Sequence, residues 1–388
     1  MSLVAALRAF GQSVRAELPE LFERYRARVD GGEAAARRPG ATEPFRARAH
    51  DSGPIAGPAA AEHHSAGTDD GPCFVDAPGA PRRVRPNCDA VEIAAMFGSV
   101  PPGRTRKGWV EFLGSCQDHA TGLVGEHLGA DRHLDPPARP SGPDRYATMA
   151  ANYALECLGS HLPAPVADVT AMTEQSLPLA LDALSWATDP WDAGHWVDCY
   201  ASCVDANVRH HGIGGPVETL FAWLDRRCDP ASGMWGSPGK HGWLLAVNGF
   251  YRLTRGTYAQ FGRPLPHPAA AKTTVWAHCH DQAVFGDGRG TACEVLDVVH
   301  PLWLCLRQDP DMREPIKAWM EERLRLTLAR WAPGQGFAFD PIAGEPGLQG
   351  TEMWLSTVYL MADLVGLAAE LDYSPRGVHR MGPGGLGG

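Results

Sequence analysis

Residues 228–236 have the sequence CDPASGMWG, and this stretch decides the fold that we predict. Asp229-Pro230 favours a tight turn, Gly233 permits a positive φ, and Trp235 can pack one helical hairpin against the next. Turns of the same kind, with Asp or Gly followed by an aromatic or apolar residue, recur at uneven spacing: QDHATGLV at 117–124, TDPWDAGHW at 188–196, FGDGRGTAC at 285–293 and APGQGFAFD at 332–340. This recurrence predicts a series of stacked helical hairpins.

The stretches between these turns have apolar residues at helical spacing, and convincing strand alternation is absent. We therefore predict an all-α fold. The expected helices span Asn87 to Phe97 and then, approximately, residues 106–116, 143–159, 168–187, 192–211, 215–228, 241–261, 268–283, 290–307, 311–331 and 350–371.

The domain organisation follows from composition. Residues 1–49 predict an N-terminal helical arm, and residues 50–85, rich in Ala, Pro, Gly and His, predict a disordered linker. Residues 86–372 form the expected main domain, and residues 373–388, ending in MGPGGLGG, form the expected flexible tail.

Charge and hydropathy limit the function classes. The formal net charge of −10 argues against a nucleic-acid partner, and no apolar run is long enough for a membrane span. The N-terminus lacks the apolar run of a signal peptide, and the ten cysteines form no compact framework. We expect a soluble cytoplasmic protein with reduced cysteines. The sequence gives no basis for an oligomeric state.

The turn motifs resemble the Gln/Asp-x-x-x-Gly-x-Trp repeats of the squalene cyclase and prenyltransferase superfamily, over residues 86–372. This resemblance implies an (α/α)6 toroid, a barrel of helical hairpins. The catalytic motifs of these families, D-x-D-D and D-D-x-x-D, are absent, and the zinc ligands of the protein prenyltransferases are not recognisable. The size and fold are also similar to those of the linalool dehydratase-isomerase type of barrel, which uses carboxylate, His and Cys side chains without a cofactor.

Polar residues inside apolar helices are the catalytic candidates, because such a toroid encloses an axial cavity. Asp89 and Glu92 share one helix face and can hold different pKa values. Alternatively, both stabilise the positive end of the helix dipole.

The stretch HWVDCYASCVDANVRHH at 195–211 is dense in polar groups. His195 and Asp198 are candidates for an acid–base pair, and Trp196, Cys199 and His211 for substrate contacts. The alternative is a solvated helix end with ordinary core cysteines.

In the stretch 275–305, one histidine with Asp281 is expected to line the cavity, and His280 is the candidate retained. His278 and His280 point in opposite directions on a helix, so we predict no metal site. Asp297 and His300 lie one turn apart in an apolar run and are also catalytic candidates; alternatively, they satisfy each other as a structural pair.

Glu352 begins the last apolar helix and is a further catalytic candidate, with a dipole effect as the alternative. Trp235 and Trp354 are candidates for substrate binding. The alternative is that aromatic residues in or near the turns only pack one helical hairpin against the next.

These features predict a cofactor-independent lyase, isomerase or cyclase that uses acid–base side chains on an apolar, isoprenoid-like small molecule. Two alternatives remain: a carbohydrate-active α/α-barrel enzyme, either a polysaccharide lyase or a glycosidase, and a non-catalytic toroid that binds a partner. No cofactor is expected, because nucleotide-binding and nucleophile motifs are absent apart from a G-x-G-x-x-G match in the tail, at 382–387, that no strand precedes.

Overall fold

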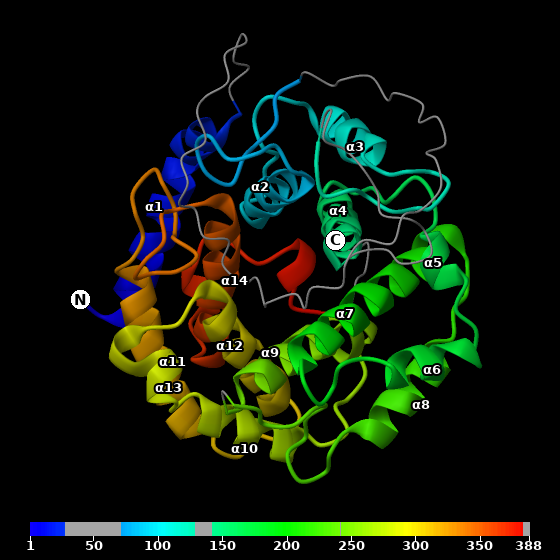
Figure 1. Ribbon diagram of the computed structural model, residues 1–388. Coiled ribbons are helices and arrows are strands. Elements are labelled where there is room, and N and C mark those ends of the chain that lie inside the picture. Colours follow the sequence, from blue (N-terminus) through cyan, green and yellow to red (C-terminus); the bar gives the residue numbers. More distant parts are fainter. Residues whose placement is uncertain (28–70, 129–141, 241, 383–388) are drawn as a thin grey trace.

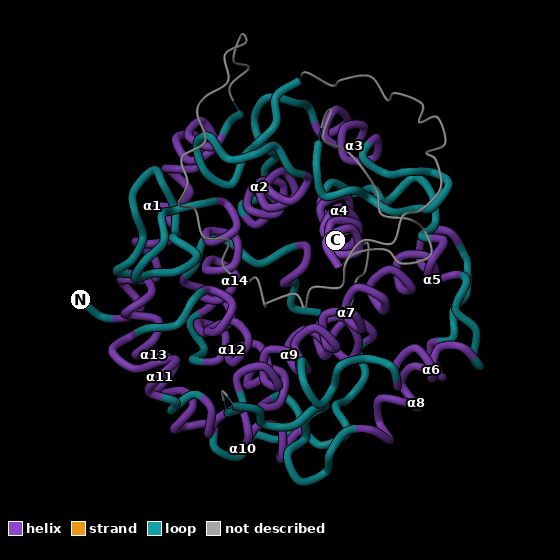
Figure 2. The backbone as a smooth tube through the Cα atoms, in the orientation of Figure 1, coloured by secondary structure: helices purple, strands orange, loops and turns teal. Residues whose placement is uncertain are grey.

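The computed structural model describes residues 1–27, 71–128, 142–240 and 242–382. Throughout these ranges the regular secondary structure is helical, as Figure 2 shows, so the all-α prediction is confirmed. No described helix combines the length and the hydropathy that a membrane span requires.

Six of the described helices form a closed inner ring in which each helix contacts the next and the last contacts the first. Figure 1 looks along the axis of this ring. In order, the ring helices are α2 (Val84–Met96), α4 (Gly142–Cys157), α7 (Pro190–Ala206), α9 (Leu244–Thr254), α12 (Ala292–Leu306) and α14 (Leu348–Leu364).

The ring helices run in the same direction. Gly249 and then Gly256 along the chain lie against Pro190 and then Asp198 of α7, and Arg85 at the start of α2 lies over Tyr146 near the start of α4. Near the far ends, Trp303 of α12 donates a hydrogen bond to Asp363 of α14. The amino ends of the ring helices therefore meet at one end of the ring.

Shorter or more peripheral helices surround this ring (Figure 1). They are α1 (Leu3–Tyr25), α3 (Arg106–Ser115), α5 (Ala167–Thr170), α6 (Ser176–Asp182), α8 (Val217–Arg227), α10 (Pro268–His278), α11 (Gln282–Phe285) and α13 (Arg313–Leu328). Two π-helical turns, η2 (Asn207–His211) and η3 (Arg255–Ala259), extend α7 and α9, and 3-10 turns lie at η4 (Gly286–Gly288), η5 (Ala368–Glu370) and η6 (Gly377–His379).

The recurrent turns of the sequence lead into the ring. Segments 117–124, 228–236 and 332–340 precede α4, α9 and α14, segment 285–293 runs into α12, and segment 188–196 forms the start of α7. Two of these turns are built alike, because the carboxylates of Asp118 and Asp229 each accept backbone N–H bonds from residues two and three positions later. The same turn chemistry thus returns the chain from a peripheral helix to the ring.

The ends of the chain pack differently from the prediction. Helix α1 packs against α13, and residues 28–49 of the expected arm lie outside the described residues. Cys73 and Phe74, from the expected linker, are buried, and α2 begins inside it at Val84. Of the expected flexible tail, residues 373–382 are described, and His379 within them is only 3% exposed.

Helices α7 and α9 approach so closely that their backbones touch. A Cβ added to Gly249 would overlap the carbonyl oxygen of Pro190, and one added to Gly194 would overlap that of Gly249. We expect Gly249→Ala to lower the free energy of unfolding by about 1–3 kcal/mol, because the two helices must separate to admit the methyl group. Urea unfolding followed by circular dichroism measures this loss.

Gly214→Ala is the control, because a Cβ at Gly214 meets no atom within 4 Å. We expect its stability to remain within about 0.5 kcal/mol of the wild type. Equal stability of the two variants would contradict the close packing of α7 and α9.

Candidate active site

Polar side chains of five ring helices converge inside the ring. We call this group the central cluster; its members are Arg85, Asp89, Tyr146, His195, Arg252 and Asp297. They come from α2, α4, α7, α9 and α12. These helices therefore place basic, acidic and aromatic groups around a common centre.

Tyr146 and Arg252 form the middle of the central cluster. The Arg252 guanidinium lies 5.3 Å from the Tyr146 ring centroid and 5.7 Å from that of Trp191. One Arg252 nitrogen lies 3.5 Å from His195 Nδ1, and the His195 ring stacks on Trp191. These contacts join α4, α7 and α9, so the Arg252 side chain reaches into the ring.

Asp297 is completely buried on α12. Neither of its carboxyl oxygens has a hydrogen-bond partner among the described residues. Burial raises the pKa of Asp297 well above its usual value, although Arg252 and Arg255 act in the opposite direction. Burial therefore favours the neutral form of Asp297, which carries a proton.

Asp89 lies 3.4 Å from Arg85 in an ion pair that forms no hydrogen bond. Burial raises the pKa of Asp89 to about 7, against the attraction of Arg85. A carboxyl group with a pKa near neutrality can either accept or donate a proton, which suits acid–base catalysis.

Asp198 and Arg255 form a buried ion pair just below the central cluster. Arg255 is the first residue of the π-helical turn η3. Its guanidinium donates hydrogen bonds to both carboxylate oxygens of Asp198 and to the hydroxyl of Tyr251. Because Asp198 is engaged in this pair, we assign it a structural role beside the site.

The C-terminal segment, residues 376–382, closes the other end of the ring; it is the red segment at the centre of Figure 1. His379 contacts Glu352 and the Tyr251 hydroxyl at 2.8 Å each, and Val378 donates its backbone N–H to Glu92. Burial alone would raise the pKa of Glu352, but His379 and hydrogen bonds hold it below its usual value. The site thus has a polar floor that ties α2, α9 and α14 together.

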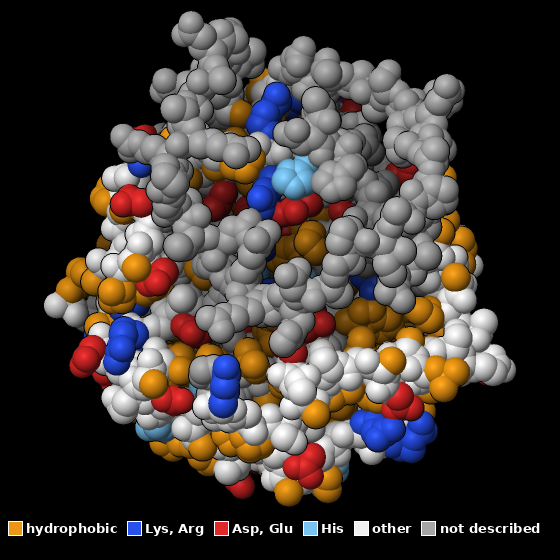
Figure 3. Space-filling view, viewed as in Figure 1, with side chains coloured by type: hydrophobic (Ala, Val, Ile, Leu, Met, Phe, Trp, Pro, Cys, Tyr) orange, Lys and Arg blue, Asp and Glu red, His pale blue; other side chains and the backbone are white. Residues whose placement is uncertain are grey.

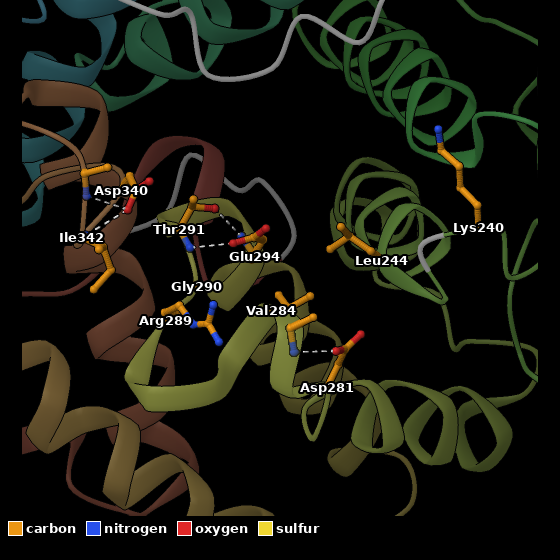
Figure 4. Close-up of a pocket in the computed structure, with 12 residues that line it drawn as sticks. Lys240, Leu244, Asp281, Val284, Arg289, Gly290, Thr291, Glu294, Asp340 and Ile342 are labelled. Carbon is orange, nitrogen blue, oxygen red and sulfur yellow. Dashed lines mark hydrogen bonds between the residues drawn. The ribbon is translucent and has the colours of Figure 1, made fainter.

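A pocket of about 710 Å³ opens at the amino ends of α9 and α12. Figure 4 shows Lys240 across it from Glu294 and Asp340. Glu294 lies one helical turn before Asp297, so the pocket borders the helix that carries Asp297. On this face of the molecule, acidic, basic and hydrophobic side chains gather near the middle (Figure 3).

A second pocket, of about 390 Å³, lies at the opposite end of the ring. Arg255, His300, Arg307 and Arg380 contribute to its lining. Burial, together with the positive charges of His379 and Arg255, lowers the pKa of His300 to about 3, so this histidine is neutral.

The structure brings together most of the catalytic candidates that the sequence suggests. Asp89, His195 and Asp297 belong to the central cluster, and the others lie directly below or beside it. These others are Glu92, Asp198, Cys199, His300 and Glu352, all buried in ring helices.

Two of the predicted catalytic residues and one predicted substrate contact lie away from the ring centre. His280 is exposed beyond the end of α10, where it bonds the carbonyl of Trp276. Asp281 caps α11 and lines only the outer pocket. His211 ends η2 and contacts His161.

The predicted tryptophan contacts are structural. Trp235 stacks on Phe250 and donates its indole N–H to a carbonyl of α8, and Trp354 donates to the carbonyl of Ala338. Trp196 stacks on Tyr200 and lies under Arg145. These rings therefore pack between ring helices and their surroundings, which was the alternative interpretation of the turn aromatics.

The alternatives for the carboxylates can also be judged. Asp297 and His300 form no hydrogen bond with each other within the described part of the chain, so they are not a mutually satisfied pair. Asp89 and Glu352 lie in the second turns of their helices, past the first-turn positions where a dipole effect is strongest.

No group of three or more His, Cys, Asp or Glu in the described ranges has the geometry of a metal site.

Sequence reasoning missed the arginines and Tyr146. Arg85 falls within the expected linker, and Arg252 and Arg255 are not among the predicted site residues. Arg252 and Arg255 could have been recognised because they lie three residues apart in the largely apolar stretch 244–261. Neither guanidinium can be buried there without a partner. His379 lay in the expected tail and gave no signal.

Comparison with models of known protein families finds no match, and comparison with curated proteins finds no significant sequence relative.

The raised pKa of Asp89 predicts a pH-dependent stability. The Asp89 carboxyl group keeps its proton up to about pH 7 in the folded protein, whereas it loses the proton near pH 4 in the unfolded chain. The free energy of unfolding therefore falls as pH rises between these values. We expect Asp89→Asn to remove this part of the decline, which raises stability relative to wild type by about 1–3 kcal/mol more at pH 8 than at pH 4.5. Denaturant unfolding at the two pH values measures the difference.

Glu111→Gln on the surface of α3 is the control, with its carboxylate two-thirds exposed. We expect it to keep the wild-type pH dependence. If Asp89→Asn and wild type lose stability equally with rising pH, the proton on Asp89 is not part of the folded state.

Proposed function

We propose that the ring is an (α/α)6 toroid and that the central cluster catalyses a cofactor-independent lyase or isomerase reaction on a small molecule. The buried Asp297 supports this proposal most strongly, because a fully buried carboxyl group without a hydrogen-bond partner among the described residues is expensive to maintain for structure alone.

The proposed chemistry divides proton transfer between two carboxyl groups. Asp297 protonates a substrate hydroxyl, which leaves as water, and Asp89 in its ionised form accepts a proton from an adjacent carbon, so that a double bond forms. Two carboxyl groups whose surroundings give them different proton affinities suit these opposite roles. For isomerisation, the same proton donor and acceptor act on a double bond.

The aromatic faces of Tyr146 and Trp191 support an apolar, isoprenoid-like substrate, because they flank the site and offer apolar contact. Burial of the carboxyl groups favours a small molecule over a polysaccharide, which needs an open cleft. A non-catalytic toroid would pair its buried polar groups with one another, whereas the oxygens of Asp297 are unpaired among the described residues.

The experiment is incubation of the purified protein with isoprenoid alcohols, beginning with linalool, in D₂O. We expect mass spectrometry to detect loss of water or incorporation of deuterium into the carbon skeleton with wild type. Absence of both products across the panel, with folded protein, would reject the isoprenoid substrate class.

A further inference from the structure

Arg252 is a buried cation without an acidic partner in the described part of the chain. Arg252 is 8% exposed, and its Nε has no hydrogen-bond partner among the described residues. Its Nη1 lies 3.5 Å from Nδ1 of His195. Arg255, one turn later, is instead paired with Asp198. Because a buried charge costs several kcal/mol unless it is paired, Arg252 is poised for an anion.

A second guanidinium lies nearby. Arg85 and Arg252 both lie over the ring of Tyr146, at 4.7 and 5.3 Å from its centroid, so their Cζ atoms are within about 10 Å of each other. Arg85 also has an Nε without a hydrogen-bond partner among the described residues. Two guanidinium groups therefore lie around the same aromatic ring.

The nearby acids form no ion pair with Arg252 among the described residues. Arg255 engages Asp198, His379 engages Glu352, and burial raises the pKa of Asp297, which favours its neutral form.

The outer pocket lies at the amino ends of the two helices that carry Arg252 and Asp297. Its lining includes Leu244, two turns before Arg252 on α9, and Glu294, one turn before Asp297 on α12. Its rim carries charges of both signs, with Lys240 and Arg289 on the basic side (Figure 4).

We propose that Arg252, assisted by Arg85 across Tyr146, binds an oxoanion, a carboxylate or phosphate group carried by the substrate. Its role as a substrate group rests on the proposed function, whereas the anion site itself does not. The aromatic faces of Tyr146 and Trp191 then hold the apolar part of the same molecule, and the oxoanion fixes its position relative to Asp297.

The test is direct binding of inorganic phosphate and of acetate, measured by calorimetry and thermal unfolding at constant ionic strength. We expect one of the two anions to raise the Tm of the wild type and to bind Arg252→Gln at least about tenfold more weakly, since hydrogen bonds to a charged group contribute about 1.5–3 kcal/mol. Preference for phosphate or for acetate identifies which oxoanion the substrate carries. Arg252→Lys keeps the charge and should bind with intermediate affinity.

Arg307→Gln is the matched control, because Arg307 is exposed and lines the second pocket at the opposite end of the ring. It should bind the anion as wild type does. Failure of both anions to bind wild type would overturn the proposal, as would weakened binding by Arg307→Gln with unchanged binding by Arg252→Gln. Anion binding through Arg252 without water loss or deuterium incorporation from the isoprenoid alcohols would support this site and reject those neutral alcohols as the substrate class.

Discussion

Asp198→Asn is expected to lower the free energy of unfolding by about 3–5 kcal/mol, because it leaves the Arg255 guanidinium buried without its counter-charge. The Asp198 side chain is fully buried and that of Arg255 is 5% exposed, so water cannot replace the lost partner. Gly256 packs directly against Asp198, which leaves no room for the helices to open and hydrate the charge. Urea unfolding at neutral pH measures the loss.

Two further variants separate this effect from a general sensitivity to substitution. The double variant Asp198→Asn/Arg255→Met removes both charges and should recover part of the lost stability. Glu218→Ala breaks a surface pair with Arg263, in which the carboxylate is 82% exposed, and should leave stability close to that of the wild type. If Asp198→Asn is as mild as Glu218→Ala, the buried pair does not hold α7 to α9.

Asp297→Asn is expected to have opposite effects on activity and on stability. Removing the proposed proton donor should reduce kcat by about 10²–10⁴-fold, the usual contribution of a general acid. The raised pKa of Asp297 means that wild-type stability falls as pH rises above about 4, so the neutral Asn variant should gain stability relative to wild type as pH increases. Product formation and denaturant unfolding, each measured between pH 5 and 8, test the two effects.

Asp363→Asn is the matched control, since Asp363 lies at the far end of α14 and its oxygen accepts a hydrogen bond from Trp303 that an amide oxygen can also accept. We expect it to retain activity. An Asp297→Asn variant with wild-type turnover would show that another group supplies the proton. If the stability of the variant relative to wild type does not increase as pH rises, Asp297 is not protonated in the folded protein.

The sequence contained most of the fold because turn chemistry is local. The Asp229 carboxylate caps its own turn, and the same arrangement at Asp118 shows why the repeats could be recognised without a structure. The helix expected at 168–187 is instead divided into α5 and α6, and the helix expected at 350–371 ends at Leu364. Periodicity marks a helix well but gives its ends less accurately.

The site was predictable only in part, for a physical reason. Polar residues inside apolar helices, such as Asp297, can be recognised from the sequence because burying a polar group without a function or a partner is costly. Tyr146 and Trp191 do not, because aromatic residues are common in any core. The role of His379 depends on a contact between the C-terminal segment and α14, and such a contact leaves no local pattern.

Closure of the ring also has a consequence for how the protein folds. Helix α14 contacts α2, although more than 250 residues separate them, so the last contact of the ring joins segments far apart in the chain. Contacts of such long range form slowly. Until they form, the interior carboxyl groups face water; in the closed ring, burial raises the pKa of Asp297 and favours its protonated form. Ring closure is therefore coupled to uptake of a proton, and mildly acidic solution should favour it.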